Sequence, residues 1–251
     1  MSADNESMGR ADLQIHTDAS DGMDDARTVL DAAHRRSLDV IAVTDHDQTR
    51  GAHEARDVAV RSNHPVEVII GSEVSSRQGH ILALWIDSPI AAFKSAEATI
   101  EAIWRQGGAA IIAHPAAIVP FALNIGDIDR LVATMSPELS GDHPPILAVE
   151  TANPIPSARW RRQSIISANQ RWRLPTTGGS DAHFHEQVGA GITRYQGRGA
   201  QALREALRSN QTSAELDNYP SLRDIGAGRL LRQQWRGMTA TPKALLARRR
   251  P

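Results

Sequence analysis

The stretch Ala11-Asp12-Leu13-Gln14-Ile15-His16-Thr17-Asp18-Ala19-Ser20-Asp21-Gly22 predicts a short β-strand that runs directly into a polar loop. Asp12, Gln14 and His16 alternate with leucine and isoleucine, so the three polar side chains share one face of the strand. Asp21 follows in the loop, directly before a glycine that allows a turn. A buried strand has little use for three polar side chains on one face unless they bind something. Taken alone, the stretch fits a half-exposed edge strand equally well.

The same pattern recurs at four other apolar segments, each of which ends in histidine or a carboxylate. In a parallel α/β barrel the carboxyl ends of the strands meet on one face, where sites are built from strand ends and the loops that follow them. Histidines scattered over a surface would not keep to that position. The pattern therefore indicates a barrel with a metal-type site on one face. The four segments are residues 40–47, 68–73, 110–115 and 176–183.

The composition limits the class of protein. The chain has 251 residues, with 28 basic and 29 acidic side chains and a formal net charge of −1, which argues against nucleic-acid binding by bulk charge. It contains no cysteine, and this excludes disulfides, iron–sulfur clusters and thiolate zinc sites. We find no signal peptide and no apolar run of membrane-spanning length, so we expect a cytoplasmic protein with no membrane partner.

The charge is unevenly distributed. Residues 220–251 contain eight arginines and lysines and one acidic residue, Asp224. We therefore expect a disordered leader over residues 1–10, one folded domain over residues 11–219 and a basic tail over residues 220–251. The tail includes a predicted helix near residues 222–235, and we expect it to be dispensable for chemistry.

About seven strand–helix repeats follow one another in the body of the chain, without a long-period sequence repeat. The predicted strand over residues 40–44 is almost wholly apolar, as is typical of a strand buried on both faces. Residues 79–86 predict an additional strand that pairs in a hairpin with residues 74–76. The predicted fold class is α/β, a single barrel-like domain with a mainly parallel sheet.

Six motifs resemble, in order, those of the PHP (polymerase and histidinol phosphatase) domain family. The resemblance spans roughly residues 10–195. It implies a distorted, TIM-like (β/α)7 barrel, up to three divalent metal ions (usually manganese, zinc or iron), and hydrolysis of phosphoesters. The motifs are Asp12-Leu13-x-x-His16-Thr17 with Ser20-Asp21-Gly22, Thr44-Asp45-His46-Asp47, Gly71-Ser72-Glu73, Gly79-His80, Ala113-His114-Pro115 and Gly179-Ser180-Asp181-Ala182-His183.

The resemblance also implies which residues bind metal. It assigns His16, Glu73 and Asp181 to a first metal; Glu73, His80 and His114 to a second, with Glu73 bridging; and Asp21, His46 and His183 to a third. Imidazole and carboxylate ligands without thiolate suit zinc, manganese or iron. The catalytic residues implied by the resemblance are Glu73, Asp181 and His183.

Position 14 departs from the family pattern, which has His-x-His where this chain has Gln14 and His16. An amide oxygen can reach a metal but binds it more weakly than imidazole does, so we expect the first metal to be held less tightly. Three further residues are predicted to act beside the metals. Asp45 would orient an imidazole. Arg194 would contact a phosphate, and His185 would either touch substrate or lie solvated in its loop.

These features together predict a phosphoesterase that uses two or three divalent ions to activate water. The expected substrate is a nucleotide, a short oligonucleotide cleaved in a 5′–3′ exonuclease-like manner, or another small phosphorylated metabolite, because an acidic body grips long nucleic acid poorly. Two alternatives stay open: a degenerate, non-catalytic module that binds partners, favoured by Gln14, and a hydrolase of non-phosphate esters or amides. We predict no obligate protein partner.

Overall fold

The structure is a computed structural model, and it describes residues 8–135 and 144–247. The strands are β1 (Met8–Ile15), β2 (Val40–Val43), β3 (Glu67–Ser75), β4 (His80–Leu84), β5 (Ala109–Ile112), β6 (Ile146–Ala152), β7 (Thr176–Gly178), β8 (Gly191–Gln196) and β9 (Thr212–Leu216). The helices are α1 (Ala26–Arg35), α2 (Arg50–Arg61), α3 (Ala96–Arg105), α4 (Ile125–Met135), α5 (Pro156–Trp172), the 3-10 turn η2 (His185–Gln187), α6 (Gly199–Arg208), α7 (Leu222–Ile225) and α8 (Ala227–Ala247).

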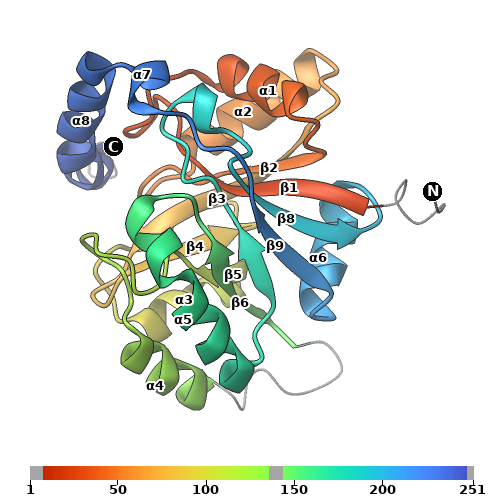
Figure 1. Cartoon of the computed structure of the whole chain (residues 1–251), viewed down its shortest axis with the longest axis vertical. Helices are drawn as coiled ribbons and strands as arrows, with labels where there is room; N and C mark the ends of the chain where they lie inside the picture. The colour runs from red at the N-terminus through yellow and green to blue at the C-terminus, as the bar shows by residue number, and fades with distance from the viewer. Residues whose placement is uncertain (1–7, 136–143, 248–251) are drawn as a thin grey trace.

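The nine strands form one sheet in the order β7-β6-β5-β4-β3-β2-β1-β8-β9, with helices packed around it (Figure 1). The sheet curls until its two ends meet. At the seam, the Gly178 backbone N–H in β7 donates to Thr193 Oγ1 in β8 at 2.8 Å, and Thr212 Oγ1 in β9 donates to the Thr176 carbonyl in β7 at 2.7 Å. The prediction of an α/β fold with a barrel-like sheet is confirmed.

Two strands are antiparallel to both of their neighbours. A regular alternation of strands and helices would instead give parallel pairs. β4 pairs antiparallel with β3 and β5, and β8 pairs antiparallel with β1 and β9. The predicted hairpin is confirmed, since Val74 pairs with Ile81 and Ser75 with His80. Because β4 runs antiparallel to β3 and β5, its first residue lies at the same face of the barrel as the last residues of those two strands.

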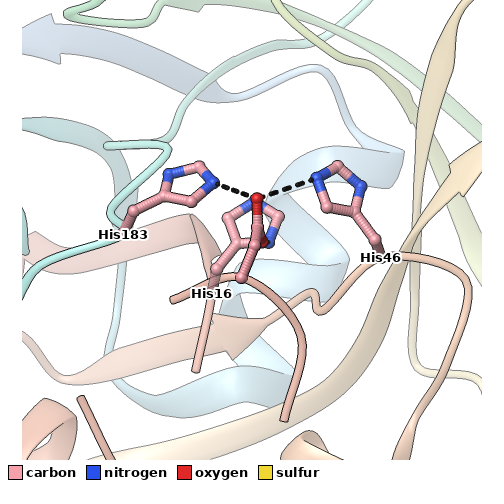
Figure 2. A group of neighbouring side chains, drawn as sticks. His16, His46 and His183 are labelled. Carbon is pink, nitrogen blue, oxygen red and sulfur yellow. Dashed lines mark hydrogen bonds and ion pairs between the residues drawn. The ribbon is translucent and has the colours of Figure 1, made fainter. Parts of the chain in front are cut away.

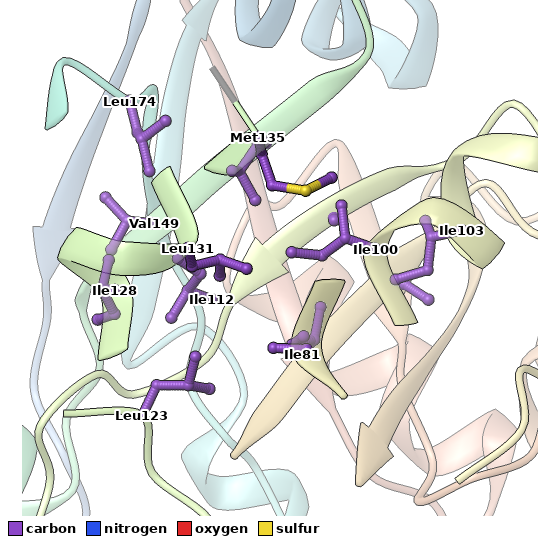
Figure 3. Packing of buried hydrophobic residues seen from close by; sticks show 14 of the residues in the cluster. Ile81, Ile100, Ile103, Ile112, Leu123, Ile128, Leu131, Met135, Val149 and Leu174 are labelled. Carbon is purple, nitrogen blue, oxygen red and sulfur yellow. The ribbon is translucent and has the colours of Figure 1, made fainter. Parts of the chain in front are cut away.

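The largest apolar cluster lies between the sheet and the three helices α3, α4 and α5 (Figure 3). Helix α3 begins where Ser95 accepts a hydrogen bond from the Ala98 N–H, and its buried positions then recur at helical spacing. The strands beneath are buried on both faces: every residue of β2, β4 and β5 is buried. The labelled members of the cluster are Ile81, Ile100, Ile103, Ile112, Leu123, Ile128, Leu131, Met135, Val149 and Leu174.

Both ends of the chain differ from the predicted domain limits. Strand β1 begins at Met8, inside the segment predicted as a disordered leader, because residues 8–11 pair with residues 193–196 of β8. The predicted tail contains α7 and α8, and α8 packs on the body of the protein. Residues 1–7 and 248–251, which include the rest of the predicted leader and the terminal arginines, lie outside the described residues. None of the described helices combines the length and apolar character that crossing a membrane requires.

Candidate metal centre

The strand ends bring the predicted ligands to one face of the barrel. His16 directly follows β1, His46 follows β2, and Glu73 lies close to the end of β3. His114 follows β5, and the loop after β7 carries Asp181 and His183. His80 is the first residue of the reversed strand β4 and so reaches the same face. Eight of the nine predicted ligands contact one another there: His16, Asp21, His46, Glu73, His80, His114, Asp181 and His183.

Glu73 lies at the centre of this cluster, and its carboxylate is 1% exposed. Its Oε1 atom lies 2.7 Å from His80 Nδ1 and 3.0 Å from His114 Nε2. Its Oε2 atom lies 3.0 Å from His16 Nε2 and 3.8 Å from His46 Nδ1. One buried carboxylate therefore has imidazoles around both of its oxygens, which is the arrangement expected of a bridging ligand.

A second group of imidazoles surrounds the Asp21 carboxylate, on the other side of His16 from Glu73. Its Oδ2 atom lies 3.1 Å from His183 Nε2 and 3.6 Å from His46 Nε2. His16 Nδ1 lies 3.5 Å from Asp21 Oδ1, while His16 Nε2 lies 3.3 Å from Asp181 Oδ1. Figure 2 shows the rings of His46 and His183 approaching from opposite sides, with His16 between them. The His16 ring thus joins the Asp21 group to the Glu73 group.

The close packing of acids and imidazoles shifts their pKa values strongly. Burial alone would raise the pKa of Glu73, but the charges of His80 and His46 and the hydrogen bond from His114 hold it well below its usual range. Burial acts to lower the pKa of His114, yet its hydrogen bond to Glu73 raises that pKa to about 9. His114 is therefore protonated at neutral pH when no cation is bound. A metal must displace such protons, so metal binding weakens as pH falls.

The cluster fits divalent metal ions. Four of its buried imidazole nitrogens lie near carboxylate oxygens but lack a hydrogen bond of good geometry. A cation between the two kinds of atom would satisfy both, whereas an empty buried cluster leaves polar atoms unpaired at a cost of about 1–3 kcal/mol each. The donor set of nitrogen and oxygen suits zinc, manganese or iron. The four nitrogens are His16 Nδ1 and Nε2, His46 Nδ1 and His80 Nδ1.

Asp45 holds a loop and, among the residues that the structure describes, bonds no imidazole, which differs from its predicted role. Its carboxylate accepts hydrogen bonds from the Thr17 N–H at 2.9 Å, from Thr17 Oγ1 at 2.7 Å and from Ser20 Oγ at 2.5 Å. A Cβ at Gly51 would lie 2.0 Å from Asp45 Oδ2, so only glycine leaves room for the carboxylate. Asp45 therefore fixes the loop that presents Asp21.

Asp12 fixes the loop after β7 in the same way. Its two carboxylate oxygens accept hydrogen bonds from the Ser180 N–H at 2.9 Å and the Gly189 N–H at 2.8 Å. Burial raises the pKa of Asp12 to about 6, against these hydrogen bonds. The loop between its two anchor points carries Asp181 and His183.

Gln14 belongs to a buried polar group that the sequence did not reveal. Its Oε1 accepts from Asn153 Nδ2 at 3.3 Å, and the same Nδ2 donates to Glu150 Oε2 at 2.9 Å. Glu150 Oε2 also accepts the His114 N–H at 2.7 Å, and burial raises the Glu150 pKa to about 8. A Cβ at Gly179 would lie 2.6 Å from Glu150 Oε1. In the sequence, Glu150 follows an apolar run just as Glu73 does. This pattern was the available signal for Glu150, although it was not used to predict the group.

His185 lies outside the cluster. Its Nδ1 is 3.1 Å from Asp24 Oδ1 and 3.5 Å from Glu186 Oε2, an arrangement of ligand types that resembles a further cation site. Arg229 neutralises both acids, however, with its Nη1 at 2.5 Å from Glu186 Oε1 and its Nη2 at 3.6 Å from Asp24 Oδ2. This group is therefore an ion-pair network.

Arg194 lies far from the predicted phosphate position. It pairs with Arg10 across β1 and β8, towards the start of β1, whereas His16 follows the end of that strand. Its side chain forms an ion pair with Glu215 at 2.9 Å. The prediction placed Arg194 at the site because the reversed direction of β8 cannot be read from its sequence.

A family model described as "PHP domain" matches residues 12–150, and one described as "PHP-associated" matches residues 159–212. An uncharacterised protein of Methanocaldococcus jannaschii is 36% identical over 129 residues, which is 47% of this chain and 73% of the relative.

Two further relatives have named activities. Phosphoribosyl 1,2-cyclic phosphate 1,2-diphosphodiesterase of Eggerthella lenta is 38% identical over 82 residues, which is 30% of each chain. The 5′-3′ exoribonuclease Rnm of Salmonella typhimurium is 36% identical over 80 residues, which is 30% of this chain and 27% of the relative. The matched region is thus less than a third of either enzyme.

A solved structure shares the fold. It is a two-domain protein of Bacteroides vulgatus that contains a PHP-like metal-dependent phosphoesterase, with a TM-score of 0.67 and 20% identity. The match covers 91% of this chain and 70% of that chain.

In Glu73→Gln, a neutral amide replaces the carboxylate between the imidazoles. We expect the purified variant to hold at least one metal ion fewer per chain than the wild type, because an uncharged amide binds cations more weakly. Elemental analysis after growth with added manganese and zinc measures this. Glu101→Gln, on the exposed side of α3, is the control and should keep the wild-type metal content. Equal metal content in Glu73→Gln would contradict the bridging position.

Gln14→His restores an imidazole to a strand face that points at the cluster. We expect the weakest-held ion to bind about tenfold more tightly, because imidazole is the better ligand for these metals. Calorimetric titration of chelator-treated protein measures the affinity, and Gln201→His on the exposed side of α6 is the control. Identical affinities in wild type and Gln14→His would show that position 14 does not reach a metal.

Proposed function

The chain belongs to the PHP domain family, and on this premise we propose that it is a metal-dependent phosphoesterase that cleaves a small phosphorylated substrate or a short oligonucleotide. The observation that carries the proposal is the buried cluster of five imidazoles and three carboxylates around Glu73 and Asp21. Buried titratable groups of both signs, packed this closely at the end of a barrel, are arranged for chemistry and not for stability.

Two or three divalent ions would occupy the cluster, held by the residues predicted from the sequence. His16, Glu73 and Asp181 would hold one; His80 and His114 would hold a second with Glu73; the third set is Asp21, His46 and His183. Bound there, such ions would lower the pKa of a water and stabilise the oxygens around phosphorus. Manganese, zinc and iron all fit these donors.

Two residues of the cluster, His183 and Asp181, are held in a fixed orientation and charge state. His183 Nδ1 is held at 2.8 Å from the Asp181 carbonyl, so its Nε2 faces Asp21. The Asp181 pKa is lowered despite burial, chiefly by the hydrogen bond from His16, so its carboxylate stays ionised at neutral pH. Its side chain is 12% exposed, against 1% for Glu73. Asp181 and His183 are thus among the more exposed members of the cluster, where they would meet a substrate and orient the attacking water.

An exposed aromatic ring next to the cluster favours a substrate with a base. The Phe121 ring stacks on the His80 ring with centroids 5.3 Å apart and an interplanar angle of 14°. The Phe121 carbonyl accepts the His80 N–H at 2.6 Å, which pins the loop, while the side chain stays 47% exposed. A fixed and half-exposed ring is suited to stacking on a nucleobase. The relative named as an exoribonuclease agrees with this chemistry, because RNA carries bases that can stack on such a ring.

The direct test is reconstitution of metal-free protein with manganese, zinc or iron, followed by a screen of phosphomonoesters, phosphodiesters and short oligonucleotides. We expect cleavage of at least one phosphoester. In Asp181→Asn turnover should fall at least about a hundredfold, a loss of about 2.7 kcal/mol of transition-state stabilisation. A protein that binds metal but cleaves no phosphoester would be a binding module, and cleavage of amides alone would make it a different hydrolase.

Phe121→Ala removes the ring beside His80. We expect KM for nucleotide substrates to rise about tenfold, consistent with stacking of about 1–3 kcal/mol, with little change for a phosphoester that lacks a base. Phe93→Ala is the matched control, since Phe93 is 45% exposed and stacks on no imidazole in the described part of the chain. An equal change for both kinds of substrate would argue against base stacking.

A further inference from the structure

Helix α8 lies beyond residue 212, where the second family match ends, yet it contacts the metal centre. Figure 1 shows α7 and α8 at one side of the molecule, after the last barrel strand β9. The sequence placed this segment in a dispensable basic tail. That expectation concerns activity, and the inner face of the helix nevertheless contacts the loops of the metal centre.

Gln233 of this helix contacts Asp21, one of the predicted metal ligands. Gln233 is 7% exposed, and its Nε2 lies 3.4 Å from Asp21 Oδ2, the oxygen that His183 and His46 also approach. One helical turn further on, a Cβ at Gly237 would lie 3.2 Å from the same oxygen. The absence of a side chain at Gly237 allows the helix to lie directly against the carboxylate.

Two arginines anchor the same face of α8 to the loops of the site. Arg236 Nη2 donates to the Asp18 carbonyl at 2.6 Å and to the Ser20 carbonyl at 3.1 Å, on either side of the turn that leads to Asp21. At the start of the helix, Arg229 pairs with Glu186 and Asp24 and lies over the Phe184 ring at 5.0 Å. Contacts therefore run along α8 to the loop before Asp21 and to the loop after His183.

We propose that α8 is a working part of the metal centre, in which Gln233 is a positioning residue that fixes Asp21 for the ion shared with His46 and His183. An amide that donates to a ligating carboxylate orients it, and such outer partners are typically worth ten- to a hundredfold in metal affinity. Because Gln233 is buried over Asp21 Oδ2, the helix also covers this side of the site from water. The inference rests on the same metal centre as the proposed function but not on the reaction catalysed.

The test is metal binding without substrate. Gln233→Leu keeps the volume and helical preference of the side chain but removes the donor. We expect calorimetric titration of chelator-treated full-length protein with zinc or manganese to show one class of site weakened about tenfold or more, while the remaining sites keep their affinity. Gln233→Asn, whose amide is one methylene shorter, should show the same selective loss and serves if the leucine variant fails to fold.

The matched control is Trp235→Gln, on the outer face of the same helix with its side chain 67% exposed, and it should bind metal as the wild type does. A Gln233 variant with unchanged affinity at every site, and with equal losses of Tm in the metal-free and metal-loaded forms, would mean that α8 only packs on the body. Because no substrate is used, selective loss of one metal would stand even if no phosphoester were cleaved.

Discussion

The structure depends on one carboxylate, Glu73, which is buried among imidazoles from four different strand ends. Burying such a charge without partners is prohibitively costly, so β1, β2, β4 and β5 must all deliver their histidines to the same point. Glu73 itself lies in β3, between parallel β2 and antiparallel β4. The reversal of β4 is what allows His80, at the start of its strand, to meet residues at the ends of the others.

A second layer of acids makes the cluster rigid. Asp12, Asp45 and Asp47 are fully buried; Asp12 and Asp45 accept hydrogen bonds from the loops that carry metal-type ligands, and Asp47 accepts from Ser75 at the end of β3. Asp45 and Asp47 directly flank His46, and Asp12 lies four residues before His16, so a single strand end supplies both a ligand and a group that holds a neighbouring segment. Ligands held in this way do not need to reorganise when a cation or a developing charge arrives.

The sequence predicted the part of the site that depends on local pattern. Alternation in β1 and the recurrence of histidine or carboxylate after apolar strands indicated seven of the eight clustered residues, because parallel strand ends converge by geometry. His80 was assigned from the resemblance to the PHP family. Strand direction and loop conformation are not encoded so locally. This is why Arg194 of β8 was expected to contact a phosphate, although it lies beside the start of β1, and why Asp45 was expected to orient an imidazole. The contact of Gln233 with Asp21 spans 212 residues and follows no periodicity, so no sequence pattern indicated it.

The order of the residues along the chain has a consequence for synthesis of the protein. Strand β1 finds one of its two partners in β8, and the barrel seam joins β7 to β8 and β9, so the sheet cannot close until most of the chain has left the ribosome. Until then His16, Asp21 and His46 have no complete set of partners. A nascent chain that stalls before β7 therefore exposes an unpaired edge of β1 together with six of the eight clustered residues, which leaves both a strand edge and metal-type ligands open to wrong partners.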